Sequence, residues 1–191
     1  MASAGYAVAS CDVENPAQRN TRRMKGILAL LPLTVGRWSS TDKICFQDIV
    51  QDDTDVVVVM LLDARQPYSL RLFKRLCKVI QNSDRIHIVV ATQNLTESFS
   101  AVAKEQHRTT YVLPIDERFG MWKMALGFAA CPALAVVDCE HGRKFSHSQE
   151  ELAVLWNEGD YVAGEWLRRR SALSRIQLVQ AALIFPNCIV Q

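Results

Sequence analysis

Cysteine carries the most reactive side chain in this chain, and six cysteines are spread along its 191 residues. They are Cys11, Cys45, Cys77, Cys131, Cys139 and Cys188. No two of them form a Cys-x-x-Cys pair, and their spacing fits neither a zinc site nor the disulfide framework of a secreted protein. Scattered single thiols are typical of a reducing compartment. We therefore expect free thiols, with Cys45 and Cys77 acting as small core residues.

The four histidines are the next candidates for chemistry: His87, His107, His141 and His147. His87 falls inside an apolar strand pattern, which favours a core or edge position, and His107 and His141 fall in predicted loops. Their spacing indicates no metal site. A Ser-His-Asp arrangement stays open, although the chain has no Gly-x-Ser-x-Gly motif and no glycine-rich phosphate loop. We expect neither a metal nor a cofactor.

The elements that must position these residues begin with two apolar strands. Residues 55–62, DVVVVMLL, are a continuous run rich in β-branched side chains, which predicts a central strand buried on both faces. Residues 85–92 predict a second buried strand. Between them Pro67 suits the first turn of a helix, and apolar residues recur at helical spacing. They are Leu70, Phe73, Leu76, Cys77 and Ile80. A helical crossover of this kind makes the two strands parallel.

The second half of the chain completes the predicted sheet. We expect a helix over 96–106 with Thr96 near its N-terminal cap, a helix over 117–129, a strand over 132–138, and a turn and return strand that form an antiparallel hairpin. The inward residues of the helix at 117–129 are predicted to be Met121, Met124, Ala125 and Phe128. The order strand, helix, strand, helix, helix, strand, strand predicts an α/β thioredoxin-like fold, a central mixed β-sheet flanked by helices on both faces.

A more specific pattern lies in residues 111–145, which read YVLPIDERFGMWKMALGFAACPALAVVDCEHGRKF. They resemble the second half of a tryparedoxin or nucleoredoxin-like domain. In that family a segment ending in Leu-Pro precedes a helix, a residue with a cis-proline, and a strand ending in Asp before a Gly-containing turn. Leu113-Pro114, Cys131-Pro132, Asp138 and Gly142 take those places, and NEGDYVAGEW at 157–166 resembles the family's tail. The similarity covers residues 30–166 and suggests a kinetoplastid-like protist as the setting.

The family's redox motif is Trp-Cys-Pro-Pro-Cys, at the end of the first long strand, where this chain reads LLDARQPYSL at 61–70. The resemblance places Arg65 at the tryptophan, Gln66 at the first cysteine, Pro67 and Tyr68 at the prolines, and Ser69 at the second cysteine. A shift by one residue would place Arg65 and Tyr68 at the cysteine positions, so neither register supplies a thiol. Thiol–disulfide exchange needs a thiolate and a second, resolving thiol. The resemblance therefore implies a thioredoxin-like domain without redox activity.

Cys131 is the strongest alternative site, because in this fold the residue before the cis-proline faces the active-site turn. Two interpretations stay open. The side chain fills an apolar position, or its thiol is glutathionylated, forms a mixed disulfide or acts as a sensor. No neighbouring Lys, His or second Cys in the sequence indicates activation of the thiol. Pro132 is implied to be cis, which would leave the adjacent backbone free to pair with an extended peptide.

We divide the chain into an arm at 1–24, a thioredoxin-like domain at 25–166 and a helical extension at 167–191. The arm, flexible or partner-bound, has the Ser, Ala and Arg of a mitochondrial presequence, but Asp12 and Glu14 count against one. The extension has an apolar stripe at helical spacing, and three interpretations of it stay open. The stripe packs on its own domain, docks in a groove of another protein, or lies on an anionic membrane surface. The stripe consists of Leu173, Ile176, Val179 and Leu183. We interpret the basic cluster at 168–170 as a solvated face.

Composition excludes several classes of protein. Apolar residues make up 49% of the chain and charged residues 22%, which suits a packed core. The net charge of +2 does not indicate nucleic acid binding, because nucleic acid binders usually carry a basic face. No apolar run is long enough to span a bilayer. We expect an intracellular reducing compartment, cytoplasmic or mitochondrial.

The leading hypothesis is a redox-inactive thioredoxin-like protein that binds other proteins as a subunit of a larger assembly. The competing hypothesis is a single-thiol oxidoreductase or glutathione-linked redox protein centred on Cys131.

Overall fold

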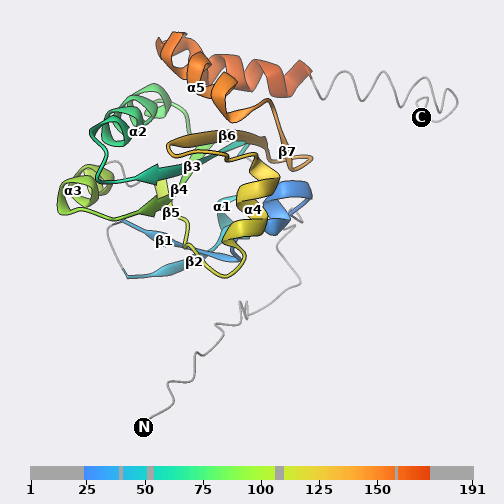
Figure 1. Cartoon of the computed structure of the whole chain (residues 1–191). Coiled ribbons are helices and arrows are strands. Elements are labelled where there is room, and N and C mark those ends of the chain that lie inside the picture. Colours follow the sequence, from blue (N-terminus) through green and yellow to red (C-terminus); the bar gives the residue numbers. More distant parts are fainter. Residues whose placement is uncertain (1–23, 39–40, 51–53, 106–109, 158, 173–191) are drawn as a thin grey trace, which may run out of the picture.

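A seven-stranded mixed sheet forms the centre of the protein in a computed structural model that describes residues 24–38, 41–50, 54–105, 110–157 and 159–172 (Figure 1). The strand order is β2-β1-β5-β4-β3-β6-β7. The strands are β1 (Thr34–Arg37), β2 (Lys43–Cys45), β3 (Val56–Asp63), β4 (Ile86–Gln93), β5 (Thr110–Val112), β6 (Ala133–Asp138) and β7 (Arg143–Lys144). The helices are α1 (Phe46–Ile49), α2 (Pro67–Ile80), α3 (Glu97–Glu105), α4 (Phe119–Leu126) and α5 (Ser148–Asn157), with short 3₁₀ turns η1 (Gly26–Leu30) and η2 (Gly159–Tyr161) and a further helix at 162–172.

Strand β3 is the central strand that the valine run predicted. It pairs in parallel with β4, and β6 pairs antiparallel with β7, both as predicted. Strand β3 also pairs antiparallel with β6. Because successive side chains point to opposite faces of a sheet, Val58 and Met60 enter one core and Val57 and Val59 enter the other. All four side chains are fully buried. A strand covered on both faces therefore explains why the run lacks polar alternation.

Helices cover both faces of this sheet. Helices α2, α3 and α5 and the helix at 162–172 contribute to one core, and η1, α1 and α4 contribute to the other (Figure 1). Pro67 occupies the first turn of α2, and the apolar stripe of that helix is buried as predicted, apart from half-buried Leu70. The hydroxyl of Thr96 accepts a hydrogen bond from the backbone N–H of Phe99 at 3.3 Å, which confirms Thr96 as the N-cap of α3.

The inward face predicted for α4 was wrong at two positions. Met121 and Met124 are 46% and 78% exposed, whereas Trp122 and Leu126 are fully buried. Trp122 and Leu126 are four residues apart, so they share the face that meets the sheet. Phe128 is buried as predicted, beyond the left-handed Gly127 that ends the helix. The helix is apolar on nearly every side, so its pattern did not distinguish between faces that differ by one residue.

The C-terminal helix corrects two further predictions. Residues 162–172 are helical, and Val162 and Trp166 are fully buried in the core, so the boundary placed after residue 166 falls inside a helix. The basic cluster at 168–170 is a solvated face only at Arg168, whose side chain is 70% exposed, because Arg169 and Arg170 are half-buried and form ion pairs with buried carboxylates of the domain. The predicted stripe Leu173, Ile176, Val179 and Leu183 and the arm at 1–23 lie outside the described residues. None of the described helices is both long and apolar enough to cross a membrane.

Gly142 allows the start of the domain to lie against the β6–β7 turn. Its φ is +65°, and a Cβ there would collide with the backbone carbonyl of Lys25, beside the hydrogen bond from the Ile27 N–H to the Gly142 oxygen at 2.9 Å. We expect Gly142→Ala to lower the free energy of unfolding by about 1–3 kcal/mol in urea denaturation. Gly120→Ala is the matched control, because no atom lies near its added Cβ and α4 should gain up to about 1 kcal/mol. Equal stability of the two variants would contradict this prediction.

Candidate functional site

The turn between β3 and α2 is the position where the resemblance placed a redox motif. Gln66 is the N-cap of α2 with extended backbone, and Pro67 follows as the first helical residue. The Asp63 carboxylate accepts hydrogen bonds from the Arg65 backbone N–H and from Asn94 Nδ2, both at 3.1 Å. These bonds, that of Arg65 foremost, hold the pKa of Asp63 below its usual value. The turn is therefore fixed by an ionised carboxylate at the end of β3.

The motif positions differ in accessibility. Arg65, Gln66 and Pro67 are exposed, and Tyr68 is 38% exposed. Ser69 is fully buried, and its hydroxyl has no hydrogen-bond partner among the described residues. Of the two positions that the resemblance matches to cysteines, Gln66 therefore faces solvent and Ser69 is buried, and the two are separated by less than one helical turn. Neither side chain can form a disulfide.

Cys131 lies beside the end of β3, where this turn begins. The Cys131–Pro132 peptide bond is cis, and the half-buried thiol donates a hydrogen bond to the Leu61 carbonyl at 3.6 Å. Burial raises the pKa of the Cys131 thiol, and the negative charge of Asp63 raises it further. The thiol is therefore protonated at neutral pH and is not activated for attack.

This pKa predicts how Cys131 reacts with alkylating reagents. We expect slow alkylation of the folded protein at neutral pH, with a rate that rises as the pH is raised above the usual thiol range, because only the thiolate reacts. Peptide-resolved mass spectrometry after timed iodoacetamide labelling separates Cys131 from the other cysteines. Buried Cys77, whose pKa burial raises to about 12, is the internal control and should react more slowly still. Rapid labelling of Cys131 at neutral pH would contradict the assignment.

Among the residues that the structure describes, the other cysteines and histidines form no second site around this turn. Cys77 and Cys139 are buried and Cys45 is half-buried, whereas Cys11, Cys188 and His107 lie outside the described residues. The His87 ring stacks on Tyr111 at 5.8 Å between ring centroids, which suits a structural role in β4. The ring of His141 contacts carboxylates, and within the described residues no serine lies at hydrogen-bond distance from it.

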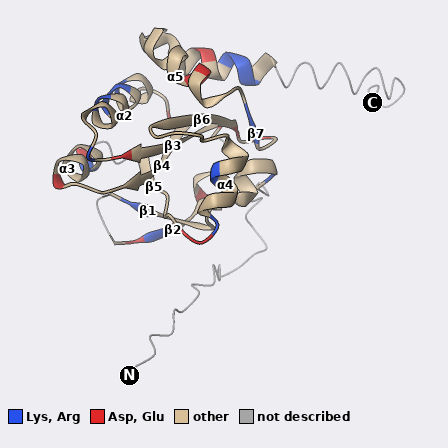
Figure 2. Cartoon of the chain, viewed as in Figure 1, with Lys and Arg blue, Asp and Glu red and all other residues tan. Residues whose placement is uncertain are grey.

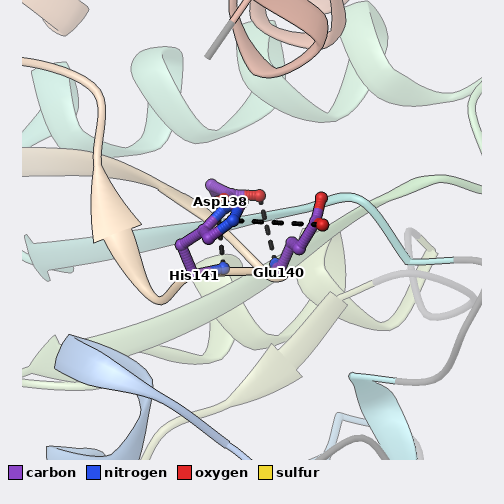
Figure 3. A group of neighbouring side chains, drawn as sticks. All are labelled: Asp138, Glu140 and His141. Atoms are coloured by element: carbon purple, nitrogen blue, oxygen red, sulfur yellow. Dashed lines mark hydrogen bonds and ion pairs between the residues drawn. The ribbon is translucent and has the colours of Figure 1, made fainter. Parts of the chain in front are cut away.

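A second cluster, which the sequence did not reveal as a unit, surrounds the β6–β7 turn. Potential ligand atoms of Asp138, Glu140 and His141 lie within 4.8 Å of one another (Figure 3). Asp138 already accepts hydrogen bonds from the backbone N–H groups of Glu140 and His141 at 3.1 and 3.0 Å, and its Oδ2 lies 2.7 Å from His141 Nδ1. Arg170 adds its guanidinium to the same carboxylates at 3.3–3.6 Å. The position of a cation is taken by an arginine, so we assign no metal to this cluster.

An aromatic pair, also not predicted, connects the motif turn to α5. Trp156 Nε1 donates a hydrogen bond to the Tyr68 hydroxyl at 2.7 Å, and the two ring centroids are 5.8 Å apart. The residues are 88 positions apart, and no periodicity in the sequence indicated the contact.

Comparison with solved structures identifies the fold. The chain has the thioredoxin-like fold. Thioredoxin from Wuchereria bancrofti matches at a TM-score of 0.54 with 17% identity over 73% of this chain and 96% of that chain. Tryparedoxin II from C. fasciculata matches at 0.54 with 12% identity over 71% and 94%, and tryparedoxin I from Leishmania major at 0.52 with 13% identity over 68% and 88%. No protein-family model and no curated protein sequence matches the chain.

Proposed function

We propose that this protein is a thioredoxin-like binding module that performs no thiol–disulfide exchange and serves as a subunit of a multiprotein assembly. The observation that carries the proposal is the pair Gln66 and Ser69 at the N-terminus of α2, one exposed and one buried. In the tryparedoxin-like resemblance these are the positions of the two redox cysteines. A site with an amide and a hydroxyl there keeps the shape of the turn but has no nucleophile for exchange.

The state of the remaining thiol supports the same function. Cys131 is half-buried and has a raised pKa, and it forms no disulfide with another described cysteine, so its thiol is neither activated nor paired with a second thiol in the described residues. The competing function, a single-thiol oxidoreductase or glutathione-linked protein, would depend on this residue alone. It predicts covalent partners, whereas a binding module predicts noncovalent ones.

The difference between covalent and noncovalent partners can be tested by co-purification. The tagged full-length chain is purified from its native cells with and without dithiothreitol, beside Cys131→Ser, and the co-purifying proteins are quantified by mass spectrometry. We expect a defined set in constant ratio that survives both the reductant and the substitution. If the set disappears with reductant and with Cys131→Ser, the single-thiol function replaces the proposal. If no protein co-purifies in constant ratio under any condition, the assembly function is wrong.

A truncated variant should keep the contacts that attach the C-terminal helix to the domain. Because Arg169 and Arg170 are ion-paired with the domain, the informative truncated variant ends after residue 172 and leaves these contacts intact. We expect this variant to fold with the stability of the full-length protein, measured by urea denaturation. A loss of co-purifying proteins in this variant would assign partner binding to residues 173–191, and retention would assign it to residues 1–172.

A further inference from the structure

We propose that the exposed face of α2 binds an acidic segment of a protein partner, with Trp156 as the aromatic contact at one end. This inference rests on the proposed binding function and names the chemistry of the partner. The α2 face consists of Tyr68, Arg71, Lys74, Arg75 and Lys78 from α2 and Trp156 from α5.

The cations of this face form a row. Arg71, Lys74, Arg75 and Lys78 follow one another at helical spacing, and from Tyr68 to Lys78 the face extends about 15 Å along the helix. Helix α2 contains no Asp or Glu, so its ribbon is blue and tan with no red (Figure 2). Arg71, Lys74 and Lys78 are exposed, and in the described part of the chain none of them pairs with a carboxylate. Four like charges on one side of a helix repel each other, and an anionic partner would relieve that cost.

Rows of unpaired cations are not a general feature of the surface that the described residues form. The chain as a whole carries only +2. The three consecutive arginines of the C-terminal helix are each neutralised by Glu165, Glu151 or the cluster around Asp138. The concentration of unmatched positive charge on α2 is therefore local.

The aromatic end of the face is held in position. Arg75 Nε and Nη2 donate hydrogen bonds to the carbonyls of Leu155 and Trp156 at 2.9 and 3.0 Å, close to the C-terminus of α5, where a cation is favoured. The same guanidinium lies 5.1 Å from the Trp156 ring centroid. Tyr68 and Trp156 remain 38% exposed each despite their mutual hydrogen bond. Trp, Tyr and Arg held rigid but exposed are the residues that dominate protein–protein interfaces.

A protein segment fits this face better than nucleic acid does. Nucleic acid binders usually present a broad basic surface and a basic net charge, whereas this face is one helix long on a nearly neutral chain. Glutamate or aspartate side chains at helical or extended spacing would match the cations. An apolar residue beside them would cover the rings of Tyr68 and Trp156.

The test uses a fluorescent glutamate-rich peptide with a central Leu-Phe pair, and the same peptide with glutamine in place of glutamate. Binding to the full-length protein is read by fluorescence anisotropy. We expect R71E/K74E/K78E to weaken binding of the glutamate peptide about ten-fold or more, and Trp156→Ala to weaken it by a similar factor. K25E/K43E/R143E changes the net charge equally at exposed positions elsewhere and should leave binding within about two-fold.

Three results would overturn the assignment. They are equal weakening by the two triple variants, equal or absent binding of both peptides, and tighter binding of a single-stranded oligonucleotide of the same charge that R71E/K74E/K78E abolishes. The last result would make α2 a nucleic acid surface. None of them touches the redox or co-purification tests, so failure here is distinguishable from failure of the proposed function.

Discussion

Replacing Gln66 and Ser69 together with cysteine should give a chain that reduces insulin, whereas we expect the wild-type chain to lack this activity. Position 66 is exposed at the N-cap of α2, where the helix dipole lowers the pKa of a thiol and raises the population of thiolate. Position 69 is buried in the first turn of the same helix, where a second thiol can resolve a mixed disulfide formed at position 66. Serine and cysteine are similar in size, and the Ser69 hydroxyl has no described hydrogen-bond partner to lose.

The single variants are the controls for this gain of activity. Gln66→Cys alone should form mixed disulfides but not turn over, because it lacks a resolving thiol, and Ser69→Cys alone should remain inactive because the residue is buried. The assay is turbidity of insulin in dithiothreitol, with intramolecular disulfide formation in Q66C/S69C followed by mass. If the wild-type chain reduces insulin and Cys131→Ser removes that activity, the proposed absence of thiol–disulfide exchange is wrong. An inactive Q66C/S69C with free thiols would show that the register of the motif is wrong.

Arg170→Ala should produce the largest loss of stability among substitutions of charged residues on the C-terminal helix. Its guanidinium lies 2.5 Å from Asp55 Oδ1 and 3.6 Å from Asp138 Oδ1, and the side chains of these aspartates are only 6% and 2% exposed. Breaking a buried ion pair by removing one partner leaves charge uncompensated, and this costs about 3–5 kcal/mol. Arg85 contacts the other carboxylate oxygen of Asp55 and would leave part of that charge compensated, so the low end of the range is the expected value.

Arg168→Ala is the matched control on the same helix. The side chain of Arg168 is 70% exposed and pairs with Glu165, whose pKa it lowers to about 2 together with Arg169. An exposed pair of this kind contributes about 0–1 kcal/mol, so Arg168→Ala should change the free energy of unfolding little. Urea denaturation of both variants measures the difference. Equal stabilities would mean that Arg170 does not anchor the helix at 162–172 to the sheet.

Much of the fold was predictable because the hydrophobic pattern of a strand or helix is a local property of the sequence. The runs at 55–62 and 85–92 have no polar alternation, and only strands buried on both faces tolerate such composition. The stripe of α2 and the Thr96 cap were likewise predictable from spacing and from the chemistry of the cap. Of the candidate site, the absence of thiols at Gln66 and Ser69 is a property of the sequence itself, whatever the structure.

Other features depended on tertiary structure. Strands β1, β2 and β5 are four residues or shorter, so their sequences contain too few alternations to predict a strand, and only pairing with neighbours makes them strands. The three arginines at 168–170 are identical in sequence, yet Arg168 is 70% exposed and Arg170 16%. The difference follows from the side of the helix that meets Asp55 and Asp138.

The α2 face shows the same division. The amino-acid order alone makes α2 amphipathic and basic on its polar side, because the 3.6-residue period separates its apolar and charged positions. It could not indicate that Trp156, 88 residues after Tyr68, would contact Tyr68 at one end of that side, because such a contact exists only once α5 packs against α2. Local periodicity specifies which side of an element is buried, whereas contacts between distant elements are specified only by how the whole chain packs.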